Sequence, residues 1–379
     1  MGETRSSKVL VLSTVHAAGD TRIFVKQAMS LADNGFQVEV VFWGDGDSEI
    51  VEDYKNGLRK IVFPRPNSGS SLLKRIKTIW HALKYGMASD AEVIIVHDPE
   101  LIPVGVFLEG EGKRVVYDAH EDLPAQFLHK KHLPIWMRFF GRWMSFLFVF
   151  AADKILSGTL CATPTIQERY RRRSCLVRNY PRLDEIEFKE GRQDDAFEKV
   201  VYIGALSEAR GILELVEAIS EVDTDCRLTL AGKWERDSFR QKCEAADTRG
   251  RVDYVGVLER GAVANTLAES GLGIVVLQSS PAYMEALPVK LFEYMASGLP
   301  VIASDFPIWR EIVDGADCGL LVEPGQISQL AGAIDEVLGD LEAARKMGAN
   351  GRKAVEEQYC WAQEEKGFVA FVSRIAGLN

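Results

Sequence analysis

Two acidic residues, a lysine and a proline lie close together in the stretch EALPVKLFEYMASGLPVIAS, residues 285–304. Pro288 favours a helix start near Val289, because its fixed φ angle suits the first helical turn. The first amide groups of that helix would be open to an anion such as phosphate. Glu285 precedes the helix and Glu293 lies in its first turns. Since carboxylates accept hydrogen bonds from sugar hydroxyls, this stretch predicts a nucleotide-sugar site. A structural role, with Glu293 favouring the helix dipole, leaves Glu285 unexplained.

Two other loops have a glycine and an arginine at a predicted helix start. In STVHAAGDTRIF, Gly19 precedes a helix expected from Thr21, and Arg22 would reinforce an anion site there. In YIGALSEARG, Gly204 follows a strand and Arg210 is placed to clamp a phosphate. The alternative for both arginines is a solvated side chain at an ordinary helix start.

Short apolar runs alternate with helical segments along the whole chain, which is typical of parallel strands covered on both faces. A first series of strands is expected at 8–14, 37–43, 91–97, 113–118 and 153–158. A second series is expected at 198–204, 226–232, 251–256, 272–278, 300–304 and 319–323. A polar segment near 179–197 reads as a linker. We therefore expect two doubly wound α/β domains facing each other across a cleft, with the chemistry in loops at the carboxyl ends of strands.

The composition excludes several classes of protein. A chain of 379 residues is long enough for two domains, and its net charge of -10 argues against nucleic-acid binding. The six cysteines are scattered, which favours reduced thiols in a cytoplasm over a zinc site or disulfides. A myristoylation-like start, MGETRS, is treated as chance. A nicotinamide-dependent dehydrogenase is only weakly supported, because no strand is followed by G-x-G-x-x-G.

The chain resembles GT-B glycosyltransferases of the large retaining family often called family 4, or group 1. The resemblance covers nearly the whole length, and its E-x7-E motif is matched by Glu285 and Glu293, followed by GLPVIASD and EIV. By this resemblance Glu293 would bind ribose hydroxyls and Glu285 the donor sugar. Amides from Leu287 through Val289 to Lys290 would hold the sugar and pyrophosphate.

The phosphate clamp of that family, G-R-L-x-x-x-K-G, appears here as GALSEARG. Arg210 matches the lysine in charge, but Ala205 replaces the arginine. We expect Lys290 or Arg22 to supply the missing charge. Pro288 is a second departure, because it has no N–H where many relatives have glycine.

The first half of the chain offers histidines at two expected strand ends. His120 in VYDAHED takes the position where the family has a histidine facing the reacting sugar, so we expect a catalytic role for it. His97 in IIVHDPE is expected near the same cleft, with a structural role favoured. Glu121 and Asp122 could serve as a base if the reaction inverted the anomeric centre.

The resemblance implies transfer of a sugar from a UDP- or GDP-linked donor to an acceptor hydroxyl, with retention, in surface polysaccharide or glycolipid assembly. Lys290 and Arg210 would stabilise charge on the leaving phosphate, and neither a cofactor nor a metal is expected. The expected domains are 1–180 with the last helix, 362–379, for the lipid-linked or glycan acceptor, and 197–361 for the donor. A nucleotide-sugar epimerase and a noncatalytic scaffold are the alternatives.

Two segments suit an anionic membrane surface. SLLKRIKTIWHALKYGM has basic residues on one predicted helix face and apolar residues on the other: Lys74, Lys77, His81 and Lys84, against Leu73, Ile76, Trp80 and Leu83. LPIWMRFFGRWMSFLFVFAAD is aromatic-rich, with Arg138 and Arg142 one turn apart. The equally weighted alternative is that both helices pack on the sheet with solvated charges. The expected location is cytoplasmic, with or without attachment to the inner face of the plasma membrane.

Overall fold

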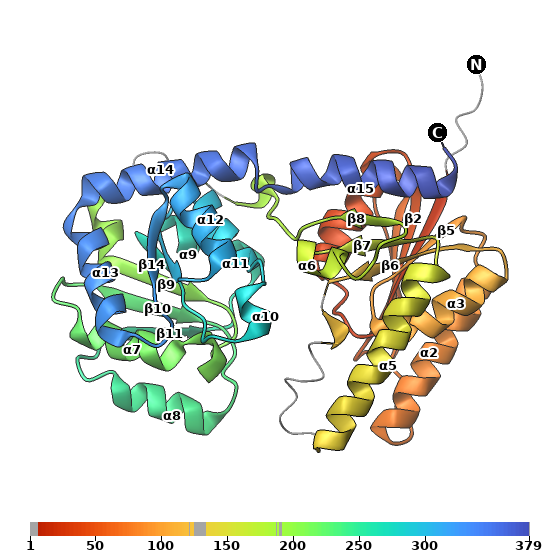
Figure 1. Cartoon of the computed structure of the whole chain (residues 1–379), viewed down its shortest axis with the longest axis horizontal. Coiled ribbons are helices and arrows are strands. Elements are labelled where there is room, and N and C mark those ends of the chain that lie inside the picture. Colours follow the sequence, from red (N-terminus) through yellow and green to blue (C-terminus); the bar gives the residue numbers. More distant parts are fainter. Residues whose placement is uncertain (1–6, 121, 125–133, 187, 189–191, 379) are drawn as a thin grey trace. The chain divides into compact units, whose positions relative to one another are not determined.

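The computed structural model describes residues 7–120, 122–124, 134–186, 188 and 192–378. The chain divides into two compact units (Figure 1). Unit 1 comprises Met1–Asn179 with Ala362–Asn379, and unit 2 comprises Tyr180–Trp361. The described residues of the segment expected as a linker, from Tyr180 onward, therefore belong to unit 2.

Unit 1 contains an eight-stranded sheet in the order β3-β4-β2-β1-β5-β6-β7-β8. All neighbours pair in parallel except β3 with β4. The central strands are continuous apolar runs buried on both faces, as in β5, whose four residues are fully buried. The strands are β1 (Lys8–Ser13), β2 (Gln37–Gly44), β3 (Ile50–Asp53), β4 (Leu58–Pro64), β5 (Val93–Val96), β6 (Arg114–Ala119), β7 (Gly158–Cys161) and β8 (Ser174–Leu176).

Helices cover both faces of this sheet (Figure 1). One side carries α2 (Ser71–Ala88), α3 (Ile102–Gly110) and α5 (Ile135–Lys154), with α3 in contact with both of the others. A π-helical segment, η1 (Thr21–Ala28), continues into α1 (Met29–Asp33). The predicted start at Thr21 is confirmed, and Ile23 and Phe24 of this segment are buried. The short α6 (Pro164–Gln167) follows β7, and α15 (Trp361–Ala376) is the last helix.

Unit 2 contains a six-stranded parallel sheet in the order β11-β10-β9-β12-β13-β14. All six predicted strands of the second series are present. They are β9 (Lys199–Ile203), β10 (Arg227–Ala231), β11 (Val252–Gly256), β12 (Leu272–Val275), β13 (Val301–Ser304) and β14 (Gly319–Val322). The helices are α7 (Ile212–Glu221), α8 (Asp237–Ala246), α9 (Arg260–Ala268), α10 (Pro281–Met284), α11 (Val289–Ala296), α12 (Pro307–Ala316), α13 (Ile327–Gly339) and α14 (Leu341–Glu357).

The predicted doubly wound α/β class is confirmed, with one misplaced strand, β7, and three missed ones. Of the run expected as a strand at 153–158, Asp153 and Lys154 end α5, residues 155–157 form a turn, and β7 begins only at Gly158. An apolar run that leaves a helix and enters a strand has no periodicity that marks the boundary. The prediction also missed β3, β4 and β8, of which β3 is exposed throughout.

Candidate functional site

The loop that carries the paired acids leads into a helix with an open start. The helix α11 begins at Val289, as predicted, and its preceding residue Pro288 (φ −71°) provides no side-chain cap. A buried side chain anchors the loop, because Trp309 donates its indole N–H to the Ala286 carbonyl at 2.7 Å. The Tyr294 hydroxyl accepts a hydrogen bond from the Ile203 amide at 2.8 Å, which fixes α11 against the end of β9. The first amides of α11 are therefore rigidly placed and uncapped.

Lys290 is a buried cation without a hydrogen-bond acceptor among the described residues. Its side chain is 9% exposed, and Nζ lies 3.7 Å from the centroid of the Tyr202 ring. Burial, with repulsion from Arg210 as a second cause, holds the pKa of Lys290 well below its usual range, although Glu293 partly opposes this. A buried amine in this state is costly unless a ligand pairs with it.

Glycines at two strand ends allow close packing around the Lys290 amine. Gly204 follows β9 with φ 147°, and a Cβ there would lie 2.5 Å from the Lys290 Nζ. Gly232 follows β10 with φ 149°, and its Cβ would lie 1.7 Å from the Gly204 carbonyl oxygen. A side chain at either position would disturb the backbone of β9 or the place of the Lys290 amine.

Arg210 is the second cation at this edge of the sheet. It ends a short turn, Glu208–Arg210, and Gly211 (φ 65°) then starts α7. The Arg210 Cζ lies 6.0 Å from the centroid of the Tyr283 ring, and its charge acts on Lys290 as described above. Two like charges at one strand-end edge match the needs of a diphosphate.

The two acids of the motif differ in their surroundings. Glu293 is half-buried in α11 and interacts electrostatically with Lys290. Glu285 is exposed at the end of α10, and its carboxylate makes no hydrogen bond or ion pair to another described residue. Leu287 is half-buried against the core beneath α11. The structure thus brings Gly204, Arg210, Lys290 and Glu293 together, with Glu285 on the loop beside them.

Arg22 requires a correction, because its charge is neutralised inside unit 1. Its Nε and one terminal nitrogen donate to the Asp118 carboxylate at 2.8 and 2.6 Å. Its other terminal nitrogen donates to the Val177 carbonyl at 2.9 Å, and the side chain is buried. Arg22 therefore has no free donor face for a phosphate, and of the two predicted replacements only Lys290 remains.

The helix start after Gly19 is also less suited to an anion than predicted. The Asp20 carboxylate accepts a hydrogen bond from the Ile23 amide at 3.0 Å, which is an N-cap by an acidic side chain. A second anion at this end would meet the negative charge of Asp20. The Gly19 loop is thus explained as a helix cap.

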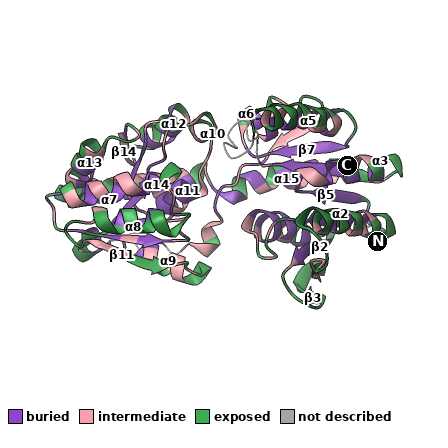
Figure 2. Ribbon diagram, turned by 90° about the horizontal axis from the view of Figure 1, so that it is seen from below, coloured by how far each residue is buried: buried purple, intermediate pink, exposed green. Residues whose placement is uncertain are grey.

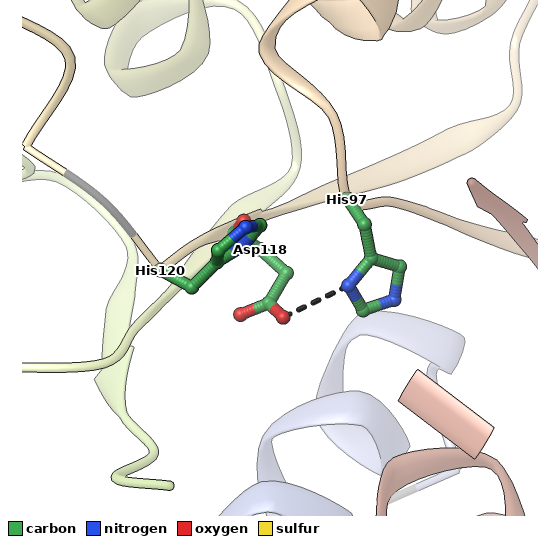
Figure 3. A group of neighbouring side chains, drawn as sticks. All are labelled: His97, Asp118 and His120. Atoms are coloured by element: carbon green, nitrogen blue, oxygen red, sulfur yellow. Dashed lines mark hydrogen bonds and ion pairs between the residues drawn. The ribbon is translucent and has the colours of Figure 1, made fainter. Parts of the chain in front are cut away.

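His97, Asp118 and His120 meet at the ends of β5 and β6 (Figure 3). The Nδ1 of the buried His97 lies 2.9 Å from the Asp118 Oδ2. The His120 Nδ1 lies 3.2 Å from the Asp118 carbonyl oxygen, and burial lowers the pKa of His120, which favours a neutral imidazole.

These three side chains have the types of metal ligands, but the geometry does not favour an ion. The Asp118 Oδ2 already accepts from Arg22, and it also accepts from Gln27 Nε2 at 3.0 Å. An ion would have to displace the Arg22 guanidinium from Asp118. The cluster is better explained as a buried polar network that places His120.

His16 is a further histidine at this edge that sequence reasoning missed. Its Nδ1 lies 3.1 Å from Oδ1 of Asp98, a buried carboxylate that also accepts from the Thr14 amide at 2.5 Å. The hydrogen bond with Asp98 raises the pKa of His16. The His16 and His120 rings lie edge to face with centroids 5.0 Å apart. In the sequence, only Asp98, which follows His97 at a strand end, indicated that a buried carboxylate could bind a further histidine here.

The structure describes one of the two residues considered as an alternative base, Asp122. Asp122 pairs with Arg169 at 2.5 Å, which neutralises it. Glu121 lies outside the described residues. Neither therefore gains support as a base for an inverting reaction.

Residues 184–354 match the family model of the glycosyl transferases group 1. An uncharacterized glycosyltransferase of Methanocaldococcus jannaschii is 28% identical over 174 residues, 45% of this chain and 43% of that protein. A GDP-mannose-dependent monoacylated alpha-(1-6)-phosphatidylinositol monomannoside mannosyltransferase of Corynebacterium glutamicum is 29% identical over 157 residues, 40% of this chain and 41% of that protein. The matched part of the chain thus spans less than half the length of these relatives.

Solved structures match over nearly the whole chain. Sucrose-phosphate synthase from Thermosynechococcus elongatus gives a TM-score of 0.80 at 19% identity, covering 99% of this chain and 100% of that one. An Anabaena protein in complex with UDP-glucose gives 0.73 at 15% identity, covering 97% and 99%. The fold is that of GT-B glycosyltransferases, and residues 184–354 carry the similarity to the glycosyl transferases group 1.

Proposed function

We propose that this chain is a retaining glycosyltransferase that moves a sugar from a nucleoside diphosphate to an acceptor hydroxyl. The observation that carries the proposal is Lys290, a buried amine with no described acceptor at the open start of α11. It lies within the segment matched by the group 1 family model. The solved complex with UDP-glucose and the GDP-mannose-dependent relative support a UDP- or GDP-linked donor.

The reaction needs stabilisation of negative charge on the leaving phosphate as its bond to the sugar breaks. Lys290, Arg210 and the amides of Val289 and Lys290 supply positive charge and donors for that phosphate. A bound phosphate would raise the pKa of Lys290 again, because an opposite charge favours the charged amine. Glu293 and Glu285 would accept hydrogen bonds from ribose and sugar hydroxyls.

His120 stays in the proposal as a neutral imidazole that hydrogen-bonds the reacting sugar. The fold favours this state, because burial lowers the pKa of His120 and Asp118 fixes its position. With retention, a phosphate oxygen of the donor would take the proton of the acceptor hydroxyl. The acceptor is proposed to be a glycan or a lipid-linked sugar of a surface polysaccharide or glycolipid, as the Corynebacterium relative suggests.

The test is nucleotide release from a panel of UDP- and GDP-sugars with lipid-linked and glycan acceptors. Glu285→Ala and Arg210→Ala should each reduce sugar transfer at least a hundredfold while the circular dichroism spectrum is unchanged. The matched controls Glu336→Ala and Arg240→Ala remove exposed charges of helices α13 and α8, away from the loop, and should leave turnover intact.

The alternatives give different results in the same assay. An epimerase would convert the donor without an acceptor, which proton NMR of the donor incubated alone would detect. A noncatalytic scaffold would bind the nucleotide without turnover on any acceptor. Full transfer by Glu285→Ala would refute the assigned site.

A further inference from the structure

Many residues of the helix α5 are exposed (Figure 2), and these include large aromatic residues along most of its length. Trp136, Phe139, Phe140, Trp143 and Phe150 are each more than half exposed, at 57–67%. Their spacing places them on one broad face of the helix. The opposite edge, which includes Gly141 and Ser145, is buried against unit 1. Water-exposed aromatics at this density mark an interaction surface.

The helix α2 exposes its own apolar residues on the same side of the sheet. Leu72, Leu73, Ile76 and Trp80 are each more than half exposed. The helix instead packs through the small residues Thr78, Ala82 and Gly86, and a Cβ on Gly86 would lie 2.8 Å from the Leu108 side chain of α3. The alternative that α2 only packs on the sheet thus leaves the exposed Leu73, Ile76 and Trp80 unexplained.

The lengths of the helices explain this exposure. At 1.5 Å per residue, α3 with its 9 residues is about 14 Å long, whereas α2 with 18 and α5 with 20 are about 27 and 30 Å long. Because α3 lies between them, it can cover only part of either neighbour. Residues 71–77 of α2 and 135–140 of α5 are accordingly exposed, apart from the half-buried Lys74 and Arg138.

The charge of these helices points to one kind of partner. The chain has a net charge of -10, yet α2 contains four Lys or Arg residues and no acid. In α5 the only acid, Asp153, is buried and paired with Lys154. Lys84 and Arg142 lie over the Trp80 and Phe146 rings, at 5.6 and 5.3 Å from the ring centroids. His81 does not add charge, because Trp43 donates to it and burial lowers its pKa.

We propose that α2 and the amino-terminal half of α5 dock on the interface of an anionic lipid bilayer. Aromatic side chains would enter the acyl boundary while Lys74, Lys77 and Arg142 contact lipid phosphates. A second copy of the chain fits less well, since a symmetric contact would bring two cationic faces together. α5 is long and apolar enough to cross a membrane by composition, but its buried edge holds it along the surface of unit 1. This inference goes beyond the proposed transfer reaction and does not depend on it.

Flotation with vesicles tests the inference. We expect the full chain to float with vesicles of equal parts phosphatidylcholine and phosphatidylglycerol, and at least tenfold less with phosphatidylcholine alone. The double variant Phe140→Glu/Trp143→Glu should lose at least tenfold in partitioning. Each of Lys74→Gln, Lys77→Gln and Arg142→Gln should cost about fivefold. The control Val51→Glu places the same charge on an exposed apolar residue of β3 and should leave flotation unchanged.

Several results would overturn the inference. Flotation equal with the two vesicle types, absence of flotation at low salt, or flotation retained by Phe140→Glu/Trp143→Glu would each do so. A dimer in light scattering that Phe140→Glu disrupts would assign the face to a second copy. The circular dichroism spectrum and the urea unfolding transition of the double variant should match those of the wild type, which separates loss of docking from loss of folding.

Discussion

Arg22 in unit 1 and Lys290 in unit 2 are both buried basic residues near the carboxyl edge of a sheet, but their surroundings are opposite. Arg22 in unit 1 is 6% exposed and donates to Asp118 and to the Val177 carbonyl. Lys290 in unit 2 is 9% exposed and has no acceptor among the described residues. Burial disfavours both charges. Asp118 overcomes this penalty and raises the pKa of Arg22, while the pKa of Lys290 falls.

From this difference we infer a structural role for Arg22 and propose a ligand-binding role for Lys290. The Arg22 pair is complete within the chain, so its role is to hold strand ends and the π-helical segment together. Lys290 lowers the stability of the empty protein, and such a cost is typical of a residue kept for a ligand. Arg22 and Lys290 are alike in burial and charge, so these two properties do not show which residue binds a ligand. Only their hydrogen-bond partners distinguish them.

The largest expected effect is on the stability of unit 1 in Arg22→Met. This change leaves the buried Asp118 carboxylate without its main partner, so the free energy of unfolding should fall by about 3–5 kcal/mol in urea denaturation. Arg59→Met is the control, because Arg59 pairs with Asp53 on the surface and should cost less than about 1 kcal/mol. Equal losses in the two variants would contradict the structural role of Arg22.

The same substitution in unit 2 should act in the opposite direction. Lys290→Met removes a buried unsatisfied amine, so the free energy of unfolding should rise by about 1–3 kcal/mol. Affinity for UDP or GDP should fall about 10- to 100-fold, since a hydrogen bond to a charged group is lost. Urea denaturation and calorimetric titration measure the two effects. A loss of stability with unchanged affinity would show that Lys290 is structural as well.

The pKa of Lys290 predicts a proton linked to nucleotide binding. The empty protein holds this pKa well below its usual range, and a bound phosphate should raise it. Binding should therefore take up a proton, and affinity should decrease as pH rises above the pKa of the empty state. Calorimetric titrations with nucleotide in buffers of different ionisation enthalpy measure the number of protons taken up on binding. This number should be up to one for the wild type and near zero for Lys290→Met. Equal numbers for the two proteins would contradict the assignment.

The smallest expected effect concerns His16 in unit 1. Its hydrogen bond with Asp98 raises the pKa of His16, so the folded state binds its proton more tightly than the unfolded state does. That stabilisation is fully present below the ordinary pKa of about 6.5 and is lost as pH rises through the raised value. The melting temperature of His16→Gln, measured across pH 5–8, should lie below that of the wild type mainly at the acid end of this range. A constant difference across this range would exclude the contribution.

The fold was more predictable from sequence than the site. In unit 2 each strand is an uninterrupted apolar run between turn residues, so the six predicted strands have counterparts in the structure. In unit 1 the edge strand β3 is exposed and carries charges, which conceals its pattern. At the site, Lys290 and the start of α11 follow from local spacing. The partner of Arg22 lies 96 positions away, and no local pattern reveals it.

The most direct test of the central claim is a crystal structure of the protein with UDP or GDP bound. The account predicts phosphate oxygens within about 3.2 Å of the Lys290 Nζ and the Val289 amide, with the ribose hydroxyls on Glu293. A nucleotide bound elsewhere, with Lys290 still against the Tyr202 ring and without a phosphate partner, would contradict it.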